Sequence, residues 1–242
     1  GPTPVAALVD HAVKGAARLA AQFMAAGFVH GVLNTDNINI TGESFDYGPW
    51  RFAPAWDAGF TAAYFDHYGL YAFGRQAEAL QWNLFQLGSA LRLIAEVDEL
   101  KGPLETYPQR YRAALSDAML GRLGVKRLGS AEDEALVAAI QKALVATQMD
   151  PDRFFFDWRS GVRRGPSPAD HQYSHDAFTD FLALIPDFAL GGPSHPYWSD
   201  EAPCTMLIEE VEALWAPIAT SDDWAPLHAK IAAIRRMGEA HR

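Results

Sequence analysis

The segment from His30 to Gly48, HGVLNTDNINITGESFDYG, carries two side chains that could bind a cation, Asn37 and Asp46. Alternating apolar residues on both sides of a Thr-Gly-Glu turn predict a short β-hairpin. Because successive strand side chains point to opposite faces, the apolar residues are expected to face the core: Ile38, Ile40, Phe45 and Tyr47. Asn37 and Asp46 would then share the other face at opposing positions, where one small cation could bridge them.

The chemistry of this pair fits magnesium. Mg²⁺ takes oxygen ligands in near-octahedral geometry, keeps several waters, and usually binds one or two protein groups together with substrate phosphate oxygens. Asn37 and Asp46 would suffice for Mg²⁺, or for Mn²⁺ in its place. Each residue alone also suits an ordinary turn, in which Asn and Asp are common. The pair together predicts half of a site for phosphate chemistry.

Protein kinases and their small-molecule relatives use the order His-Arg-Asp-x-x-x-x-Asn, a short hairpin, and Asp-Phe-Gly. On that pattern His30 takes the histidine place, Asn37 the asparagine place, and Asp46-Tyr47-Gly48 the place of the metal-binding triplet. Val32 falls where a kinase carries its catalytic aspartate, so phosphoryl transfer through that position is impossible. The nearest replacement carboxylate is Asp36.

Four stretches carry a resemblance to a known family: GFVHGVLNTDN, FDYGP, Gly69-Leu70-Tyr71-Ala72-Phe73 and Trp82-Asn83-Leu84. They resemble the selenoprotein O family, also called YdiU, of kinase-like protein adenylyltransferases, with specificity from about Gly27 to Leu93. The implied fold is mainly α: a protein-kinase-like C-terminal lobe, helical, with one short β-hairpin that carries the metal-binding residues. The implied activity is transfer of AMP from ATP, with magnesium, onto Ser, Thr or Tyr hydroxyls of proteins.

The resemblance also implies roles for three residues. In that family the aspartate matching Asp36 is the proposed proton acceptor, and the residues matching Asn37 and Asp46 bind the metal. Asp46 would also lie against the nucleotide phosphates. These roles agree with general chemistry, because a carboxylate beside a metal can accept a hydroxyl proton while the cation neutralises charge on the phosphoryl oxygens. A capping or loop carboxylate is the alternative for Asp36.

The nucleotide-covering half of a kinase-like site is not visible in this sequence. Kinases take their glycine-rich loop and phosphate-holding lysine from an N-terminal lobe. No Gly-x-Gly-x-x-Gly occurs, and lysines such as Lys14 and Lys101 lie within helical patterns or at their ends. We therefore expect residues 3–242 to be a catalytic, metal-binding lobe that lacks the N-terminal nucleotide lobe and has little activity alone. Gly1-Pro2 is typical of an expression-tag remnant.

Two alternatives to adenylyl transfer stay open. One is a kinase-like phosphotransferase that uses Asp36, since the phosphorus attacked depends on how the nucleotide lies. The other is a non-catalytic pseudokinase module that kept the fold and lost turnover. The intact pair Asn37 and Asp46 counts against the second alternative.

Helical patterns flank the candidate hairpin. Apolar residues recur at three- and four-residue steps from Val5 to Met24, and Gly27 is expected to end this helix. A longer helix is predicted from Arg75 to Leu100, closed by Gly102-Pro103. Further patterns span about 105–120, 131–149, 175–184, 205–215 and 224–237. We expect a mostly helical single domain, with an aromatic-rich irregular segment at residues 50–73 whose rings pack.

Composition excludes several classes of protein. The 242 residues are 49% hydrophobic and carry a formal charge of −10, which supports a folded core and argues against a nucleic-acid partner. No apolar run approaches the roughly 20 residues of a membrane span, and no signal peptide precedes the first helix. The single cysteine, Cys204, excludes an internal disulfide and fits a reducing compartment. We expect a cytoplasmic protein whose partners are ATP and protein substrates, without nucleic acid or membrane.

Three other groupings have simpler explanations. His171 and His175 have zinc-ligand spacing, but the second more closely matches a helix start. Ser194-His195 lacks the strand-to-helix elbow of a serine hydrolase, which favours a loop. Phe154–Trp158 could dock a partner, although large apolar residues usually pack in a core.

Overall fold

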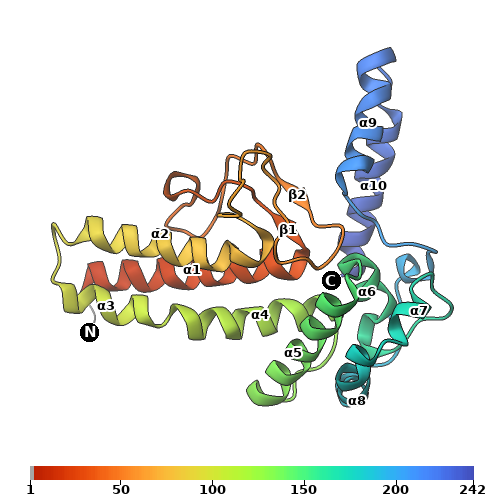
Figure 1. Ribbon diagram of the computed structural model, residues 1–242, viewed down its shortest axis with the longest axis horizontal. Coiled ribbons are helices and arrows are strands. Elements are labelled where there is room, and N and C mark those ends of the chain that lie inside the picture. Colours follow the sequence, from red (N-terminus) through yellow and green to blue (C-terminus); the bar gives the residue numbers. More distant parts are fainter. Residues whose placement is uncertain (1–2) are drawn as a thin grey trace. The chain divides into compact units, whose positions relative to one another are not determined.

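The computed structural model describes residues 3–242, so the Gly1-Pro2 pair assigned to a tag lies outside the described residues. Residues 3–242 are mainly helical, with one two-stranded sheet (Figure 1). The chain divides into two compact units. One consists of the chain up to Arg51 and of Asp57–Met119, and the other of Phe52–Trp56 and Leu120–Arg242. Within the described chain, no helix is long and apolar enough to cross a membrane.

The regular elements of the first unit run from α1 to α4, whose last residues, from Leu120, belong to the second unit. They are α1 (Pro4–Ala26), β1 (Phe28–Val29), the 3-10 turn η1 (Thr35–Asn37), β2 (Arg51–Phe52, at the border of the units), the 3-10 turn η2 (Phe73–Arg75), α2 (Gln76–Leu91), α3 (Val97–Glu105) and α4 (Tyr107–Leu123). Helix α1 lies between α2 and α3 (Figure 1). The core of the first unit forms there, from Val9, Val13, Leu19, Leu33, Leu80, Leu84, Leu100 and Leu104.

Helix α1 confirms the first predicted helix. Thr3 caps it by accepting a hydrogen bond from the Ala6 N–H at 3.3 Å, and Pro4 occupies the first turn, where its missing N–H costs nothing. Gly27 ends the helix in the left-handed conformation, with φ of 69°. Many buried alanines on its face let the neighbouring helices approach closely.

The predicted helix from Arg75 to Leu100 is wrong as one element. It is two helices, α2 and α3, and Pro103 lies inside α3 rather than beyond its end. Asp98 and Glu99 in the first turn of α3 favour a new helix start there, since acidic side chains stabilise a helix N-terminus. The break lets the chain fold back, so that Leu100 and Leu104 reach the core around α1.

A close backbone approach seats the turn at residues 39–43 on α1. A Cβ atom added to Gly15 would lie 2.8 Å from the Gly42 Cα, and one added to Gly42 would lie 2.6 Å from the Gly15 Cα. Gly42 also has φ of 87°, in the region that favours glycine. The position of the turn that follows Asn37 therefore depends on a glycine in a helix more than 20 residues earlier in the chain.

Replacing Gly15 by alanine is expected to destabilise the protein by about 1–3 kcal/mol, because neither backbone can yield without displacing the turn. The matched control is Gly121→Ala in α4, where a new Cβ meets nothing within 4 Å. There the exchange should stabilise by about 0.5–1 kcal/mol, as alanine for glycine does in a helix. Urea denaturation measures both. Equal effects of the two variants would contradict the close approach.

The second unit holds the elements from α5 to α10. They are α5 (Ser130–Thr147), α6 (Pro151–Asp157), the 3-10 turn η3 (Arg159–Gly161), α7 (Asp170–Tyr173), the 3-10 turn η4 (Asp176–Phe178), α8 (Thr179–Phe188), the 3-10 turn η5 (Pro196–Ser199), α9 (Ile208–Ser221) and α10 (Ala225–Ala240). The helical patterns predicted at 131–149, 205–215 and 224–237 correspond to α5, α9 and α10, and the 105–120 pattern corresponds to α4. The pattern at 175–184 is η4 followed by α8.

Core packing of Phe154–Trp158 is confirmed. These side chains are buried, and Phe154 contacts the rings of Phe178 and Phe181 edge-on or tilted. Most of the segment forms α6, which the sequence patterns did not predict. Asp150 caps this helix by accepting from the Asp152 N–H at 2.8 Å, ahead of Pro151 at its first position. An Asp-Pro helix start was therefore readable in the sequence.

Candidate metal and proton-transfer site

The candidate metal residues lie on a tight reversal of the chain. One antiparallel bridge pairs Ile38 with Ser44, and the Phe45 N–H donates to the Asn37 carbonyl at 3.1 Å. The regular strands lie elsewhere, at β1 and β2. The predicted hairpin is thus reduced to a single bridge. It still brings residue 37 beside residue 45, the neighbour of Asp46.

The expected orientation of the apolar side chains is wrong for three residues. Ile40, Phe45 and Tyr47 are 48%, 43% and 45% exposed. The reason is that Asn37 belongs to the 3-10 turn η1, so no strand alternation starts from it, and the turn faces α1 with its glycine backbone. The Tyr47 hydroxyl instead donates back to the Ser44 carbonyl at 2.8 Å.

Asn37 is held in one orientation. Its side chain is 5% exposed, and its Nδ2 donates to the Val32 carbonyl at 2.9 Å. Since a carbonyl can only accept, the nitrogen must face Val32. The Oδ1 atom accepts no hydrogen bond from any residue between 3 and 242, which leaves this oxygen available to a ligand.

Asp46 is exposed and has φ of 59°. The left-handed region costs an ordinary residue roughly 1–2 kcal/mol, although Asp tolerates it better than most. Two of the other non-glycine residues at positive φ, Gln148 and Asp222, close helices. Asp46 closes no helix, and such conformations away from helix ends are often found at binding sites.

His30 connects both sides of the reversal. It is completely buried, its Nε2 lies 2.8 Å from the Phe45 carbonyl, and its Nδ1 lies 3.3 Å from the Val32 N–H. Because a carbonyl accepts and an N–H donates, the ring is the neutral tautomer with its proton on Nε2. Burial lowers the pKa of His30 below its ordinary 6.5, against the opposing effects of the Phe45 carbonyl and the Asp46 charge.

Acid is expected to destabilise the protein through His30. The unfolded chain binds a proton near pH 6.5 and the folded chain resists it, so the free energy of unfolding decreases as pH falls below 6.5 towards the lower folded-state pKa. Urea denaturation over a pH series should show this decrease in full in the wild type and in His11→Asn, an exposed control. The decrease should be smaller in His30→Asn, where burial of His241, whose pKa is lowered to about 4, still contributes. An NMR titration that places the pKa of His30 at or above 6.5 would contradict it.

Gln76 is a supporting residue that no sequence motif marks. It is buried at the first position of α2, and its Oε1 accepts from the His30 N–H at 3.0 Å. Its Nε2 donates to the Phe28 carbonyl at 2.8 Å and the Phe73 carbonyl at 3.4 Å. One amide therefore attaches α2 to the segment that leads into the candidate site.

Replacing Gln76 by leucine is expected to destabilise the protein by about 2–5 kcal/mol, because a buried N–H and a buried carbonyl each lose their partner at about 1–3 kcal/mol. Gln86→Leu, the same exchange at a partly exposed position of α2, should change stability by less than about 0.5 kcal/mol. Denaturant midpoints of both variants measure the difference. A Gln76→Leu variant as stable as Gln86→Leu would show that the amide is dispensable.

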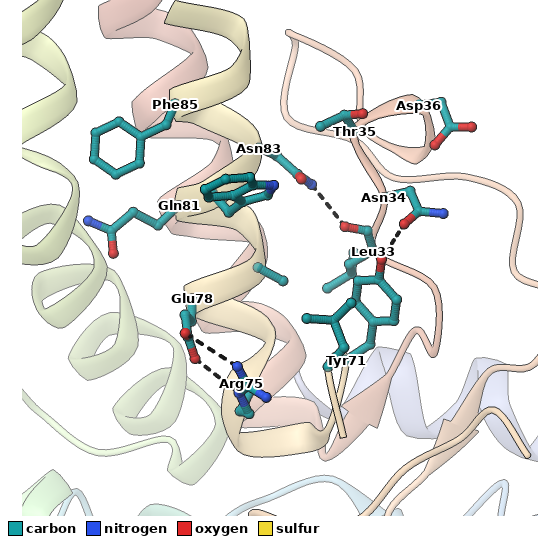
Figure 2. Close-up of a pocket in the computed structure, with 13 residues that line it drawn as sticks. Leu33, Asn34, Thr35, Asp36, Tyr71, Arg75, Glu78, Gln81, Asn83 and Phe85 are labelled. Carbon is teal, nitrogen blue, oxygen red and sulfur yellow. Dashed lines mark hydrogen bonds and ion pairs between the residues drawn. The ribbon is translucent and has the colours of Figure 1, made fainter. Parts of the chain in front are cut away.

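Asp36 lies at a pocket of about 770 Å³ between residues 33–36 and α2. Figure 2 shows Asn34 and Asp36 on one side and Glu78, Gln81 and Phe85 on the other. The Asp36 side chain is exposed, and the described residues offer it no ion pair. Arg75, by contrast, is paired with Glu78 at 3.0 Å.

Two polar contacts hold the pocket wall that carries Asp36. The Tyr71 hydroxyl donates to the Asn34 Oδ1, and the Asn83 Nδ2 donates to the Leu33 carbonyl at 3.0 Å. Burial, followed by the charges of Asp66 and Asp36, raises the pKa of Tyr71. Tyr71 and Asn83 belong to two of the four stretches that carried the resemblance, and this geometry gives both a positioning role.

Adjacent residues therefore take different environments. Asp36 is exposed at the pocket, whereas Asn37 is buried and does not line it. The backbone of Asn37 pairs with that of Phe45, the neighbour of Asp46. Asp46 does not line the pocket either. The structure thus places the two candidate metal residues away from the pocket that Asp36 lines.

His175 and His195 have structural roles. The Nδ1 of His175 accepts from the Ala177 N–H at 3.0 Å and caps η4, which confirms a helix start. His195 caps η5 in the same way through the Tyr197 N–H at 3.1 Å, which confirms a loop at Ser194-His195. In the part of the chain that the structure describes, no three His, Cys, Asp or Glu side chains group to hold a metal. A magnesium site of one or two protein oxygens needs no such group.

Comparison with known proteins identifies the family. Residues 2–176 match the model of the family described as protein adenylyltransferase SelO. This chain belongs to the SelO family. The match covers both candidate metal residues and Asp36, as well as the pocket around it.

Curated relatives of the SelO family extend the similarity beyond the matched part. A protein nucleotidyltransferase YdiU of Gloeobacter violaceus is 36% identical over 233 residues, covering 91% of this chain and 48% of the relative. One of Trichormus variabilis is 33% identical over 246 residues, covering 93% and 50%. One of Pseudomonas paraeruginosa is 40% identical over 154 residues, covering 63% and 31%. The chain spans about half the length of the first two relatives.

Proposed function

We propose that this chain is the catalytic, metal-binding lobe of a protein adenylyltransferase that moves AMP from ATP onto Ser, Thr or Tyr hydroxyls of proteins. Membership of the SelO family and relatives named protein nucleotidyltransferase support nucleotidyl transfer. The observation that supports the proposal is the contrast between the environments of residues 36 and 37. The Asn37 amide is held by the Val32 carbonyl in a residue whose backbone pairs with Phe45, the neighbour of Asp46, and the exposed Asp36 carboxylate lies at a pocket.

The proposed site binds Mg²⁺ or Mn²⁺ through Asn37 and Asp46. The donor set fits these ions, which prefer oxygen ligands and keep water and phosphate oxygens in the other positions. The bound cation supplies neutralisation of charge on the phosphoryl oxygens. The chain orients its ligands through the Val32 carbonyl, which holds the Asn37 amide, and through His30, which holds the backbone before Asp46.

In the proposed reaction the acceptor hydroxyl oxygen attacks the α-phosphorus of ATP. The bond between that phosphorus and the oxygen bridging to the β-phosphorus breaks, and pyrophosphate leaves. The hydroxyl proton passes to the Asp36 carboxylate, which lies on the exposed side of η1. Val32 cannot accept this proton, so no second base competes at the kinase position.

Little activity is expected from the 242-residue chain alone. It spans about half of relatives such as that of Gloeobacter violaceus, and the chain supplies no glycine-rich loop to cover phosphates. Activity tests therefore use what we call the full-length protein, the longest natural form that contains this chain.

The test compares ATP labelled at the α-phosphate with ATP labelled at the γ-phosphate. The full-length protein, Mg²⁺ and a mixture of acceptor proteins should yield acid-stable label from the α-position only. Label from the γ-position alone would establish the kinase alternative. Metal-dependent ATP binding without either label would support the pseudokinase module instead.

A further inference from the structure

The pocket beside Asp36 continues into an apolar surface whose side chains are not buried in the core. Its lining includes Leu70, Trp82 and Phe85, all large side chains that are exposed, with Trp82 at 63%. The predicted packing of the aromatic segment at residues 50–73 is correct for Trp56 and Phe73, which are buried. It is wrong for Tyr64, Phe65 and Tyr68, which are exposed.

A second hollow of about 620 Å³ shares Arg75 with the pocket. Tyr64 and Tyr68 line it, at 90% and 93% exposure. The two hollows meet where the chain runs from Gly69 to Ala72. Together they bring the exposed rings of Tyr64, Tyr68, Trp82 and Phe85 onto the first unit, with Asp36 at one wall of the pocket.

The chemistry of this surface fits an extended peptide better than a small molecule. Small-molecule pockets enclose most of their ligand and bury the lining side chains. Here Leu70, Trp82 and Phe85 are at least 45% exposed, as in grooves that hold peptide segments through a few apolar anchors. Tryptophan is among the residues that most often dominate such binding.

The charges of the lining favour a basic peptide over an acidic one. Arg75 and Glu78 compensate each other through two contacts at 3.0 and 3.4 Å. Asp36 is then the one charge of the pocket lining without an ion pair among the described residues. The formal charge of −10 adds a general repulsion of acidic segments.

We propose that this surface binds the segment of the protein substrate that carries the acceptor hydroxyl, and that it selects an extended segment with large apolar and basic neighbours. The inference rests on the proposed function, because it takes Asp36 as the proton acceptor. The hydroxyl is placed at Asp36, and the apolar neighbour lies against Trp82.

The experiment measures peptide binding by fluorescence anisotropy, without ATP. Three fluorescein-labelled peptides have one central serine with flanks of Leu and Lys, Leu and Glu, or Gly alone. The 242-residue chain and the full-length protein should both bind the Leu-Lys peptide most tightly. Trp82→Ala should weaken this binding at least about tenfold, as expected for an anchor worth roughly 1.4 kcal/mol or more.

Matched variants separate the surface from general effects. Trp215→Ala on α9 removes a tryptophan of nearly equal exposure, 61%, and should leave the affinity unchanged. Asp36→Asn should reduce the preference for Lys over Glu flanks without removing the preference for Leu over Gly. Thermal melting checks that each variant is folded.

Several results would overturn the inference. They are equal affinity for the three peptides, no binding at all, or no effect of Trp82→Ala. Binding to the 242-residue chain but not to the full-length protein would assign the surface to an internal interface. Failure of the proposed function is a separate result. It would appear as the absence of label transfer from the α-position, whereas the peptide affinities are measured without ATP. Conversely, transfer of α-label without selective binding of the Leu-Lys peptide would contradict only this inference and not the proposed function.

Discussion

Replacing Asp46 by glycine in the full-length protein is expected to lower AMP transfer by roughly 100-fold or more, without destabilising the fold. A metal ligand contributes several kcal/mol of transition-state stabilisation, and each 1.36 kcal/mol is a factor of ten in rate. Glycine adopts the left-handed conformation of Asp46, at φ of 59°, without steric cost. Transfer of α-label at saturating Mg²⁺ measures the rate, and urea denaturation measures the stability.

Asp222→Gly is the matched control for this prediction. Asp222 is likewise an aspartate at positive φ, 54°, but it closes α9 in the second unit. Glycine there should leave the transfer rate unchanged. Normal transfer by Asp46→Gly, or an equal loss in Asp222→Gly, would remove the metal role assigned to Asp46. Recovery of the AMP-transfer rate of Asp46→Asn at high Mn²⁺ concentration would support the metal role of Asp46.

Replacing Asp36 by asparagine is expected to lower the turnover number for AMP transfer by about 100- to 10,000-fold, the usual range for a general base. The KM for ATP should stay within about threefold, because the exposed Asp36 does not belong to the proposed cation-binding side. Steady-state kinetics of the full-length protein with labelled ATP separate the two parameters. Asp36→Glu, which keeps a carboxylate, should restore part of the rate.

The control for Asp36 is the same exchange at Asp187, an exposed aspartate on α8. Asp187→Asn should behave as the wild type in both parameters. A normal turnover number for Asp36→Asn would mean that the proton leaves to solvent or to another group. A raised KM for ATP with normal turnover would instead move Asp36 to nucleotide binding.

Several elements of the fold were predictable because their causes are local. The periodicity and the caps of α1 depend on consecutive residues, from Thr3 to Gly27. The family resemblance carried by Asn37, Asp46 and Asp36 was readable because motifs depend on residue type and spacing. The same holds for the caps at His175 and Asp150, although the second was overlooked.

Other features could not be predicted because their causes are contacts between distant residues. The break between α2 and α3 follows from the docking of Leu100 and Leu104 around α1. Gln76 supports the His30 segment over 46 positions of sequence, and no local pattern marks such a contact. The outward side chains of Ile40 and Phe45 follow from the packing of Gly42 on Gly15, which overrides strand alternation.

The sequence by itself therefore determined the helical character, the family and the residue types at the candidate site. Only the tertiary structure decided which way those residues face. It buries the amide of Asn37 with its oxygen oriented, and it leaves Asp36 exposed beside an aromatic surface. The physical reason is that residue type limits which bonds a side chain can make, whereas its orientation depends on the partners that folding brings to it.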